Sequence, residues 1–494
     1  MRWRDFDSLL PLPDNFLDST KTVHFIGIGG IGMSALARVM AARGHRVSGS
    51  DEKAGETTRL LESENIRVVI GHSADNLQVL DAPADAVIFS SAITKDNEEF
   101  AAAQSQNIPL WHRAQLLAHF VNNAENAIAV SGTHGKSTTS ACIAHILVEC
   151  GFNPTAILGA VYPPFDSNVR IGSHDLLVVE ADESDGSFTL LKPSVSVITN
   201  VEAEHLENYS DSEDELWRAF AIFKDSARDA VVLNADDKQL MQRLDPRGEE
   251  LSFGLNNGLL RANNIQIVEE RATFDIEYSM HDVTELVGTY GVGAPGRHNI
   301  SNALAAVCAA TTLDGQFPEA YQRAGESLLD FYGVARRFQY VGEASGVRVY
   351  DDYGHHPTEV ARTLETAREF LGRPLIAVFQ PHRYSRTQQM GRDFGPSFRD
   401  ASRVIITPIY SAWEIPIEGV SSQIIYDAVR AQFPDKDVRL ATSLEHAREL
   451  VRELAHESDA VFCLGAGDIT TLPPLILDDL RAKESEAKTA ETLV

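Results

Sequence analysis

Residues 126–139, NAIAVSGTHGKSTT, are the stretch that best predicts the fold of this chain. A run of small and β-branched apolar residues is followed by a glycine-containing loop and then by a helix-length segment, KSTTSACIAHILVECG (Lys136–Gly151). A strand, a glycine loop and a helix in this order are typical of α/β folds with a parallel sheet. Consecutive backbone N–H groups of such a loop can surround a phosphate group.

The composition of the loop predicts a site for a nucleoside triphosphate. We expect Lys136 to contact the β- and γ-phosphates and the Ser137 hydroxyl to ligate Mg²⁺. The loop is two residues shorter than the common G-x-x-x-x-G-K-[ST] pattern, because residue 130 is valine. A helix start that merely contains glycine is the alternative, but it leaves the clustering of Gly, Lys, Ser and Thr unexplained. The predicted ATP contacts are Gly132, Thr133, His134, Gly135, Lys136, Ser137 and Thr138.

Short apolar runs alternate with helix-length segments over about residues 22–472. Near-continuous apolar strands are typical of parallel sheets whose two faces are covered by helices. Alternating residues at 251–290 predict inserted antiparallel strands, and the polar stretches 121–126 and 333–337 predict linkers. We therefore predict an α/β chain with three domains, at 21–124, 125–334 and 335–480, with an N-terminal extension (1–20) and a polar tail (481–494).

The composition excludes several classes of protein. With 494 residues, of which 44% are hydrophobic, the chain is globular and too long for a single core. Its formal net charge of −28 repels phosphate backbones and anionic lipids, so we expect neither a nucleic acid nor a membrane as a partner. No apolar run approaches the about 20 residues of a membrane helix, and the N-terminus lacks a signal-peptide core. Four cysteines without zinc spacing fit a reducing compartment, and we expect a cytoplasmic protein.

A second glycine loop, GIGGIG (27–32), follows an apolar run that starts at residue 23. Glycines at these positions permit a tight turn and let the next helix approach a diphosphate. Asp51 ends the next predicted strand, where an acid accepts a hydrogen bond from a ribose hydroxyl. The pattern predicts a nucleotide diphosphate more firmly than a nicotinamide, and a close-packed turn without a ligand is the alternative. The predicted contacts are Gly27, Gly29, Gly30, Gly32 and Asp51.

Polar side chains follow two further predicted strands. Glu180 begins EADESD after one apolar run, and His205 ends NVEAEH after the next. We call the glycine-containing loop at 132–138 the phosphate loop. Because the carboxyl ends of parallel strands meet at one edge of a sheet, we expect both residues near this loop. Carboxylate oxygens suit Mg²⁺, and the predicted metal ligands are Ser137, Glu180 and His205. The alternatives are a solvated acidic loop and a histidine satisfied by local hydrogen bonds.

Two polar stretches follow predicted strands in the C-terminal third. DDYGHHPTE (351–359) presents Tyr353 and His355, and a metal site there is the weaker interpretation because the H-x-x-x-H spacing is missing. QPHRYSRT (380–387) contains two arginines that share one face if the segment is helical and are then suited to clamp a carboxylate. Surface salt bridges are the alternative for these arginines, Arg383 and Arg386.

Together these motifs resemble the Mur ligase family, which builds the peptide of the peptidoglycan precursor. The resemblance extends from His24 to Leu472 and is carried by HFIGIGGIGMSALA, SGTHGKSTT, EADESDGSF, NVEAEHLENY, GRHNISNALAA, DDYGHHPTEV and FQPHRYSRT. It implies an N-terminal Rossmann-like domain for a UDP-sugar, a central P-loop ATPase domain and a C-terminal Rossmann-like domain for an amino acid. Within the family, the likeness is to members that join L-alanine to UDP-N-acetylmuramate through an acyl phosphate, with ATP and Mg²⁺.

The resemblance also implies roles for individual residues. Adenine contacts are implied for His298, Asn299 and Asn302, and a contact with the nucleotide phosphates is implied for Arg337. The region that lines the incoming amino acid is matched by Tyr353, His355, Arg383 and Arg386. The implied catalytic residues are Lys136, Glu180, His205, Arg337 and His355. The acceptor of the alanine ammonium proton stays open between His205 and His355.

Three alternative functions remain at this level. A related family member joins a recycled tripeptide to the same UDP-sugar, although DDYGHHPTEV favours the alanine-adding members. A nicotinamide dehydrogenase explains GIGGIG but leaves the GKST loop without a function, and a P-loop module that only hydrolyses ATP is the third. The sequence also leaves open a monomer or a homodimer. Trp413, where the family usually has glycine, leaves the strictness for L-alanine open.

Overall fold

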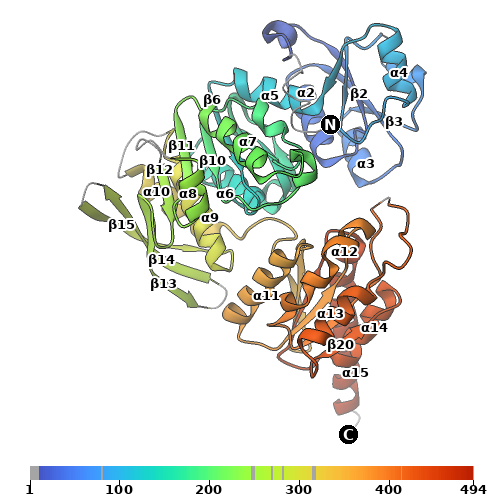
Figure 1. Ribbon diagram of the computed structural model, residues 1–494, viewed down its shortest axis with the longest axis vertical. Helices are drawn as coiled ribbons and strands as arrows, with labels where there is room; N and C mark the ends of the chain where they lie inside the picture. Colours follow the sequence, from blue (N-terminus) through green and yellow to red (C-terminus); the bar gives the residue numbers. More distant parts are fainter. Residues whose placement is uncertain are drawn as a thin grey trace. The chain divides into compact units, whose positions relative to one another are not determined.

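The computed structural model describes residues 11–78, 80, 82–245, 251–268, 271–280, 283–313, 319–412 and 414–492. These residues form three β-sheets with flanking helices, coloured blue, green and orange along the chain in Figure 1. The predicted α/β class with three sheet-containing domains is confirmed. The chain divides into two compact units, of which the second comprises residues 332–494 with the short segments 266–272 and 293–297. The boundaries of the three domains stay a prediction.

The first sheet has five parallel strands in the order β3-β2-β1-β4-β5. Because the strand order reverses at β1, the loop after β1 opens at the switch point where α/β folds bind ligands. All residues of β1 are buried, as expected for a strand covered on both faces. The strands are β1 (Thr22–Ile26), β2 (Arg46–Asp51), β3 (Arg67–Ile70), β4 (Ala86–Phe89) and β5 (Leu110–His112), with helices α2 (Ile31–Ala42), α3 (Glu56–Ser63), α4 (Glu98–Ser105) and α5 (Arg113–Asn123).

The second sheet has ten strands in the order β15-β14-β13-β12-β11-β10-β6-β9-β7-β8. The strand before the phosphate loop, β6, lies between β10 and β9 and is parallel to both, so the carboxyl ends of these three strands share one edge. The strands are β6 (Asn126–Ser131), β7 (Pro154–Tyr162), β8 (Ser167–Arg170), β9 (Ser173–Glu180), β10 (Val195–Ile198), β11 (Ala230–Asn234), β12 (Leu251–Gly254), β13 (Leu260–Val268), β14 (Arg271–Met280) and β15 (Val283–Val292). The helices are α6 (Lys136–Glu149), α7 (Glu213–Asp225), α8 (Lys238–Arg243), α9 (Arg297–Ala310) and α10 (Glu319–Ser327).

The inserted strands at 251–290 have two orientations. Strand β12 is parallel to β11 and β13, which departs from the antiparallel arrangement predicted for the whole stretch. Strands β13 and β14 are antiparallel, because hydrogen bonds join Arg261 to Ser279 (2.6 Å) and Asn263 to Glu277 (3.1 Å) in opposite directions along the two strands.

The third sheet has six strands in the order β16-β17-β21-β18-β19-β20. All neighbouring pairs are parallel except β16 and β17, which form an antiparallel pair at one end of the order. The strands are β16 (Gln339–Ala344), β17 (Val347–Asp352), β18 (Leu375–Phe379), β19 (Arg403–Ile406), β20 (Asp437–Leu440) and β21 (Ala460–Leu464). The helices are α11 (Pro357–Leu371), α12 (Tyr384–Met390), α13 (Gln423–Gln432), α14 (Leu444–Leu454) and α15 (Leu472–Thr492).

Two segments that composition predicted to be irregular are helical. The predicted linker 121–126 continues α5 as far as Asn123, and Val121 is fully buried in a core that α5 shares with β6. The predicted polar tail continues α15 as far as Thr492, since Ala, Glu and Lys favour a helix even without an apolar face. Within the described residues we find no helix with the length and apolar character needed to cross a bilayer.

Candidate active site

The phosphate loop after β6 depends on two glycines with left-handed backbone. Gly132 has φ of +133°, and Gly135, the N-cap of α6, has φ of +85°. A Cβ at Gly132 would lie 2.1 Å from Thr199 Oγ1, and one at Gly135 would lie 2.6 Å from Asn302 Oδ1. No side chain caps α6, so its first N–H groups can bind an anion in this compact loop.

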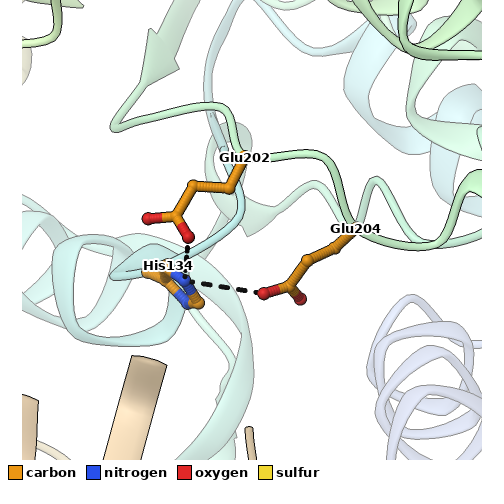
Figure 2. A group of neighbouring side chains, drawn as sticks. All are labelled: His134, Glu202 and Glu204. Carbon is orange, nitrogen blue, oxygen red and sulfur yellow. Dashed lines mark ion pairs between the residues drawn. The ribbon is translucent and has the colours of Figure 1, made fainter. Parts of the chain in front are cut away.

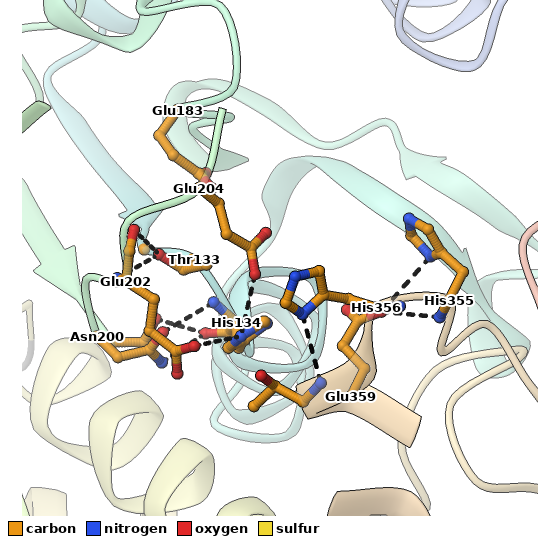
Figure 3. A network of polar contacts seen from close by, with 12 residues as sticks. Thr133, His134, Glu183, Asn200, Glu202, Glu204, His355, His356 and Glu359 are labelled. Atoms are coloured by element: carbon orange, nitrogen blue, oxygen red, sulfur yellow. Dashed lines mark hydrogen bonds and ion pairs between the residues drawn. The ribbon is translucent and has the colours of Figure 1, made fainter. Parts of the chain in front are cut away.

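Asn200 after β10 fixes the backbone of the loop, as Figure 3 shows. Its side chain accepts from His134 N (2.9 Å) and donates to His134 O (2.9 Å), and its carbonyl oxygen accepts from Thr133 N (3.0 Å). The Glu202 N–H donates to the Thr133 hydroxyl (2.8 Å). Asn200, the first residue of NVEAEH, was not among the predicted site residues, although its position after a predicted strand was an available signal.

Lys136, the first residue of α6, folds back onto its own loop. Its Nζ donates to the carbonyl oxygens of Gly132 (2.7 Å) and Thr133 (3.1 Å). Nζ also forms a 2.7 Å ion pair with Glu183 Oε2, and only 5% of the Glu183 side chain is exposed. Glu183 lies within EADESD but was not among the predicted site residues. The ammonium group is thus held in the phosphate loop by three acceptors.

Burial and charge set the protonation of this ion pair. Burial by itself lowers the pKa of Lys136, but the carboxylates of Glu183 and its neighbours raise it above the ordinary value. Burial raises the pKa of Glu183 to about 7, and Lys136 opposes this shift only in part. Lys136 is therefore charged at neutral pH, and a positive charge is what the predicted contact with phosphate requires.

Glu180 is the last residue of β9 and lies beside the strand of the phosphate loop, since it pairs with Val130 in β6. Its carboxylate packs closely on Gly159 in β7, where a Cβ would lie 2.1 Å from Glu180 Oε2. Glycine at 159 therefore makes room for this acid. The prediction that Glu180 lies at the edge of the phosphate loop agrees with this register.

A different histidine–carboxylate group lies on the same edge. Figure 2 shows His134 of the loop between Glu202 and Glu204, with Nε2 to oxygen distances of 3.4 and 3.7 Å. In the described residues, this is the one group of three histidine, cysteine or acidic side chains whose ligand atoms lie within 4.8 Å of one another. His205 is 31% exposed and its Nδ1 lies 3.8 Å from Glu207. The predicted metal set of Ser137, Glu180 and His205 stays a prediction.

A nucleoside triphosphate with Mg²⁺ fits these residues. The first N–H groups of α6 have no side-chain cap, so they can approach a phosphate closely. Lys136 supplies a fixed positive charge, and the Ser137 hydroxyl and Glu180 carboxylate are the oxygen ligands that Mg²⁺ prefers.

The three residues implied as adenine contacts differ in burial. Asn299 and Asn302 of α9 are buried, and Asn302 Nδ2 donates to Asn299 Oδ1 (3.2 Å). Asn302 also lies against Gly135 in the phosphate loop. His298 is exposed at the start of the same helix. Asn302 therefore contacts the loop directly, and a contact of any of the three with adenine stays a prediction.

The GIGGIG loop in the first sheet is built around Asp51. Gly27 has φ of +78°, and the Gly29 N–H donates to Asp51 Oδ2 (2.8 Å). A Cβ at Gly29 would lie 2.8 Å from the same oxygen, whereas Gly30 caps α2 without a side-chain hydrogen bond. Asp51 thus holds the glycine loop, and it retains lone pairs for a ribose hydroxyl.

Arg113 joins this loop to the acidic loop of the central sheet. Its Nη1 lies 3.5 Å from the position of a Cβ at Gly32, and its Nη2 lies 3.6 Å from Asp185 Oδ2. Arg113 was not among the predicted site residues, because a single arginine after a strand belongs to no motif.

In the C-terminal unit, Glu359 organises the DDYGHHPTE loop (Figure 3). Its Oε2 accepts from the backbone N–H groups of His355 (3.0 Å) and His356 (3.3 Å), and His356 caps α11. His355 Nδ1 lies 3.1 Å from the Tyr353 carbonyl oxygen. Burial lowers the pKa of His355 to about 3, although Glu359 opposes the shift. His355 is therefore neutral at neutral pH.

The two consecutive arginines before β16 contact this loop. The guanidinium carbon of Arg337 lies 5.3 Å from the centre of the Tyr353 ring, and its Nη1 lies 3.5 Å from Glu359 Oε1. Arg336 forms a 3.4 Å ion pair with Asp351. These contacts place the predicted Arg337 beside the predicted Tyr353 in the same unit.

The segment that contains Arg383 and Arg386 is only partly helical, and a shared role for the two arginines stays a prediction. Arg383 is the N-cap of α12 with φ of +71°, so the three-residue helical spacing applies only to residues after it. Its N–H donates to Tyr410 O (2.8 Å). The His382 and Tyr410 rings stack at 5.7 Å, and burial and Arg386 lower the pKa of His382 to about 4. Trp413 lies outside the described residues.

The low pKa of His355 predicts acid sensitivity of this unit. The pKa of His355 is 6.5 in the unfolded chain and about 3 in the folded one. At any pH between these values the unfolded chain binds more protons, so the stability of the folded chain falls as the pH drops below about 6.5. Between pH 7 and pH 5, we expect the free energy of unfolding of His355→Gln to fall by about 2 kcal/mol less than that of the wild type. Hydrogen exchange of β17 and β18 peptides measures this, with exposed His456→Gln as the control. Equal losses in His355→Gln and the wild type would contradict the prediction.

Comparisons with known proteins are consistent across sequence and structure. Three family models match in order: "Mur ligase family, catalytic domain" at residues 22–125, "Mur ligase middle domain" at 130–310 and "Mur ligase, glutamate ligase domain" at 336–467. The UDP-N-acetylmuramate–L-alanine ligase of Agrobacterium fabrum is 39% identical, covering 93% of this chain and 97% of the relative. That of Myxococcus xanthus is 40% identical, covering 93% and 95%.

Solved structures show the same similarity. The UDP-N-acetylmuramate–alanine ligase of Thermotoga maritima has a TM-score of 0.79 and 28% identity, covering 94% of this chain and all of that chain. A murein peptide ligase from Psychrobacter arcticus, at 22% identity and a TM-score of 0.65, shares the fold. From the three ordered domain matches and the full-length relatives, we conclude that the chain belongs to the Mur ligase family.

Proposed function

We propose that this protein joins L-alanine to the lactyl carboxylate of UDP-N-acetylmuramate, with ATP as the source of the activating phosphoryl group. The observation that carries the proposal is the phosphate loop with its buried Lys136–Glu183 pair, in a chain that aligns over 93% of its length with UDP-N-acetylmuramate–L-alanine ligases. A proposed ATP site on the second sheet and a proposed nucleotide-diphosphate site on the first sheet would have no use in a simple hydrolase.

The chemistry follows from the poor leaving ability of a carboxylate oxygen. The lactyl carboxylate attacks the γ-phosphorus of ATP, and ADP leaves, which gives an acyl phosphate. The amine of L-alanine then attacks the acyl carbon to form a tetrahedral intermediate. Phosphate leaves with the former carboxylate oxygen, and the ammonium proton passes to a base. Water must be excluded, because it would hydrolyse the acyl phosphate.

Residues of the central sheet are proposed to stabilise the phosphoryl transfer. Lys136 would neutralise charge on the γ-phosphate, and Asn200 would keep the loop N–H groups in place. Ser137, Glu180 and His205 are the proposed holders of Mg²⁺, which supplies Lewis-acid stabilisation of phosphate oxygens. Asn299 and Asn302, with His298, are proposed to bind adenine.

The remaining ligands are assigned to the other two sheets. GIGGIG and Asp51 are proposed to bind the UDP part, which is supported by the hydrogen bond of Asp51 to Gly29. Tyr353, Arg383 and Arg386 are proposed to bind alanine. His355 is a weak proton acceptor because burial lowers its pKa to about 3, so we propose that His355 positions Tyr353 and does not take the ammonium proton of alanine.

We also propose domain boundaries at 124/125 and 334/335, a monomer or homodimer, and a cytoplasmic location. The three separate sheets support the boundaries. The four cysteines, Cys142, Cys150, Cys308 and Cys463, are free, which fits a reducing compartment.

A phosphate-release screen tests the proposed function. The purified protein is mixed with ATP, Mg²⁺, UDP-N-acetylmuramate and one amino acid at a time. We expect phosphate release with L-alanine to exceed that with other amino acids by at least about tenfold, since a pocket built around a methyl group excludes larger side chains. Release that requires a tripeptide would favour the related peptide ligase instead. Release independent of the UDP-sugar would contradict both.

A further inference from the structure

A buried carboxylate lies in the first sheet, among residues that the proposed mechanism does not use. Glu99, in the first turn of α4, has a fully buried side chain. Its oxygens accept four hydrogen bonds, from the Ser50 hydroxyl (2.6 Å), His24 Nε2 (3.2 Å), the Asn76 amide (2.5 Å) and the Ser73 N–H (3.3 Å). A carboxylate with this many donors is rigidly held.

Glu99 is charged despite its burial. Burial alone raises the pKa of this group, but the hydrogen bonds from His24, Ser50 and Asn76 outweigh it and lower the pKa below the ordinary value. A buried anion is costly unless it is fully satisfied, and a buried position on a helix can be filled by an apolar residue instead. Its presence therefore calls for a role beyond packing.

The hydrogen-bond chain fixes the proton on His72. Because the Ser50 hydroxyl gives its hydrogen to Glu99 Oε2, the Ser50 oxygen must accept from its next neighbour. That neighbour is His72 Nδ1, at 3.1 Å, which also lies 3.6 Å from Glu99 Oε1. Nδ1 therefore carries the hydrogen, and in the neutral ring Nε2 is the hydrogen-bond acceptor.

His72 stands at the place in the sheet where a nucleotide base is expected. The glycine loop follows β1, Asp51 ends the neighbouring β2, and His72 comes two residues after the end of β3, the next strand in the order. In dinucleotide-type sites the diphosphate lies at the first of these strands and the ribose at the acid after the second. The His72 side chain is 23% exposed, and no described residue hydrogen-bonds to its Nε2.

We propose that His72 recognises the uracil ring of the UDP-sugar, with Nε2 accepting a hydrogen bond from uracil N3–H. Glu99 is a positioning residue, which acts through Ser50 to keep the hydrogen on Nδ1. This inference rests on the proposed binding of a UDP-sugar to the first sheet. Cytosine has a lone pair at N3 in place of the hydrogen, so it would face the lone pair of Nε2 and be rejected.

Calorimetric titration of the full chain with UDP and with CDP tests the proposal. We expect the wild type to bind UDP at least about tenfold more tightly than CDP, because one partner of a hydrogen bond would be missing. In His72→Phe the affinity ratio should fall to near one, and in Glu99→Gln it should fall in the same direction. The exposed neighbouring acid provides the matched control, Glu98→Gln, which should keep the wild-type ratio.

His72 is partly exposed, so we expect His72→Phe to fold. This variant therefore still tests the proposal if Glu99→Gln is unstable. An unchanged UDP-to-CDP ratio in His72→Phe, or equal loss of both nucleotides, would overturn the proposal. In turnover, His72→Phe should raise KM for UDP-N-acetylmuramate about tenfold and leave kcat and KM for ATP unchanged, a pattern that general loss of structure does not give. Nucleotide binding needs no catalysis, so a wild type that selects UDP but does not ligate alanine would contradict only the proposed function.

Discussion

Replacing Lys136 with alanine is expected to lower kcat by about 10³-fold while the affinity for UDP stays unchanged. The ammonium group is the one fixed cation inside the described phosphate loop, and its removal leaves the charge on the transferring phosphoryl oxygens without that partner. The UDP part is proposed to bind the first sheet, which Lys136 does not contact. Steady-state kinetics and calorimetric titration with UDP measure the two effects separately.

The control for this variant must account for Glu183. Removing Lys136 leaves a buried carboxylate without its ion pair, which destabilises a fold by about 3–5 kcal/mol. Lys136→Ala combined with Glu183→Gln removes that penalty, and exposed Lys192→Ala is the matched lysine control. If the double variant turns over at a wild-type rate, or if UDP affinity falls together with kcat, the separation of the two sites is wrong.

Glu180→Gln is expected to lower kcat by about 10²-fold and to raise the Mg²⁺ concentration needed for half-maximal activity. Glutamine has nearly the same shape, so the packing on Gly159 is kept and only the charge at the end of β9 is lost. Loss of one carboxylate weakens the binding of a hard dication. Magnesium titrations of the initial rate measure the shift.

Glu207→Gln is the control for this prediction. Glu207 lies after β10 on the same sheet, but its side chain is 71% exposed and pairs loosely with His205. Its replacement should leave both kcat and the Mg²⁺ requirement close to the wild-type values. A normal Mg²⁺ dependence in Glu180→Gln would show that this acid does not hold the metal.

Local motifs predicted the parts of the structure that depend on short-range sequence. The strand, glycine loop and helix that the apolar run and the glycines predicted are present at 126–149. GIGGIG lies at the switch point of a parallel sheet. The helix-length segment Lys136–Gly151 was predicted two residues too long, because α6 ends at Glu149 and Gly151 has left-handed backbone.

Contacts between distant segments were not predictable in this way. Glu183 is held by Lys136 from another strand end, and Glu99 is held by side chains 23 to 75 residues away. Neither acid has a spacing that distinguishes it from a solvated one. The left-handed backbone of Arg383 was not predicted either, because no glycine or asparagine marks this position in the sequence.

The transfer of a labelled oxygen tests the acyl-phosphate route most directly. UDP-N-acetylmuramate carrying ¹⁸O in both lactyl carboxylate oxygens is converted with ATP and L-alanine, and the inorganic phosphate is analysed by mass spectrometry. We expect one ¹⁸O atom in each phosphate released, because the carboxylate oxygen that attacks the γ-phosphorus leaves with it. Phosphate without the label, alongside alanine-dependent ligation, would contradict phosphoryl transfer to the sugar acid.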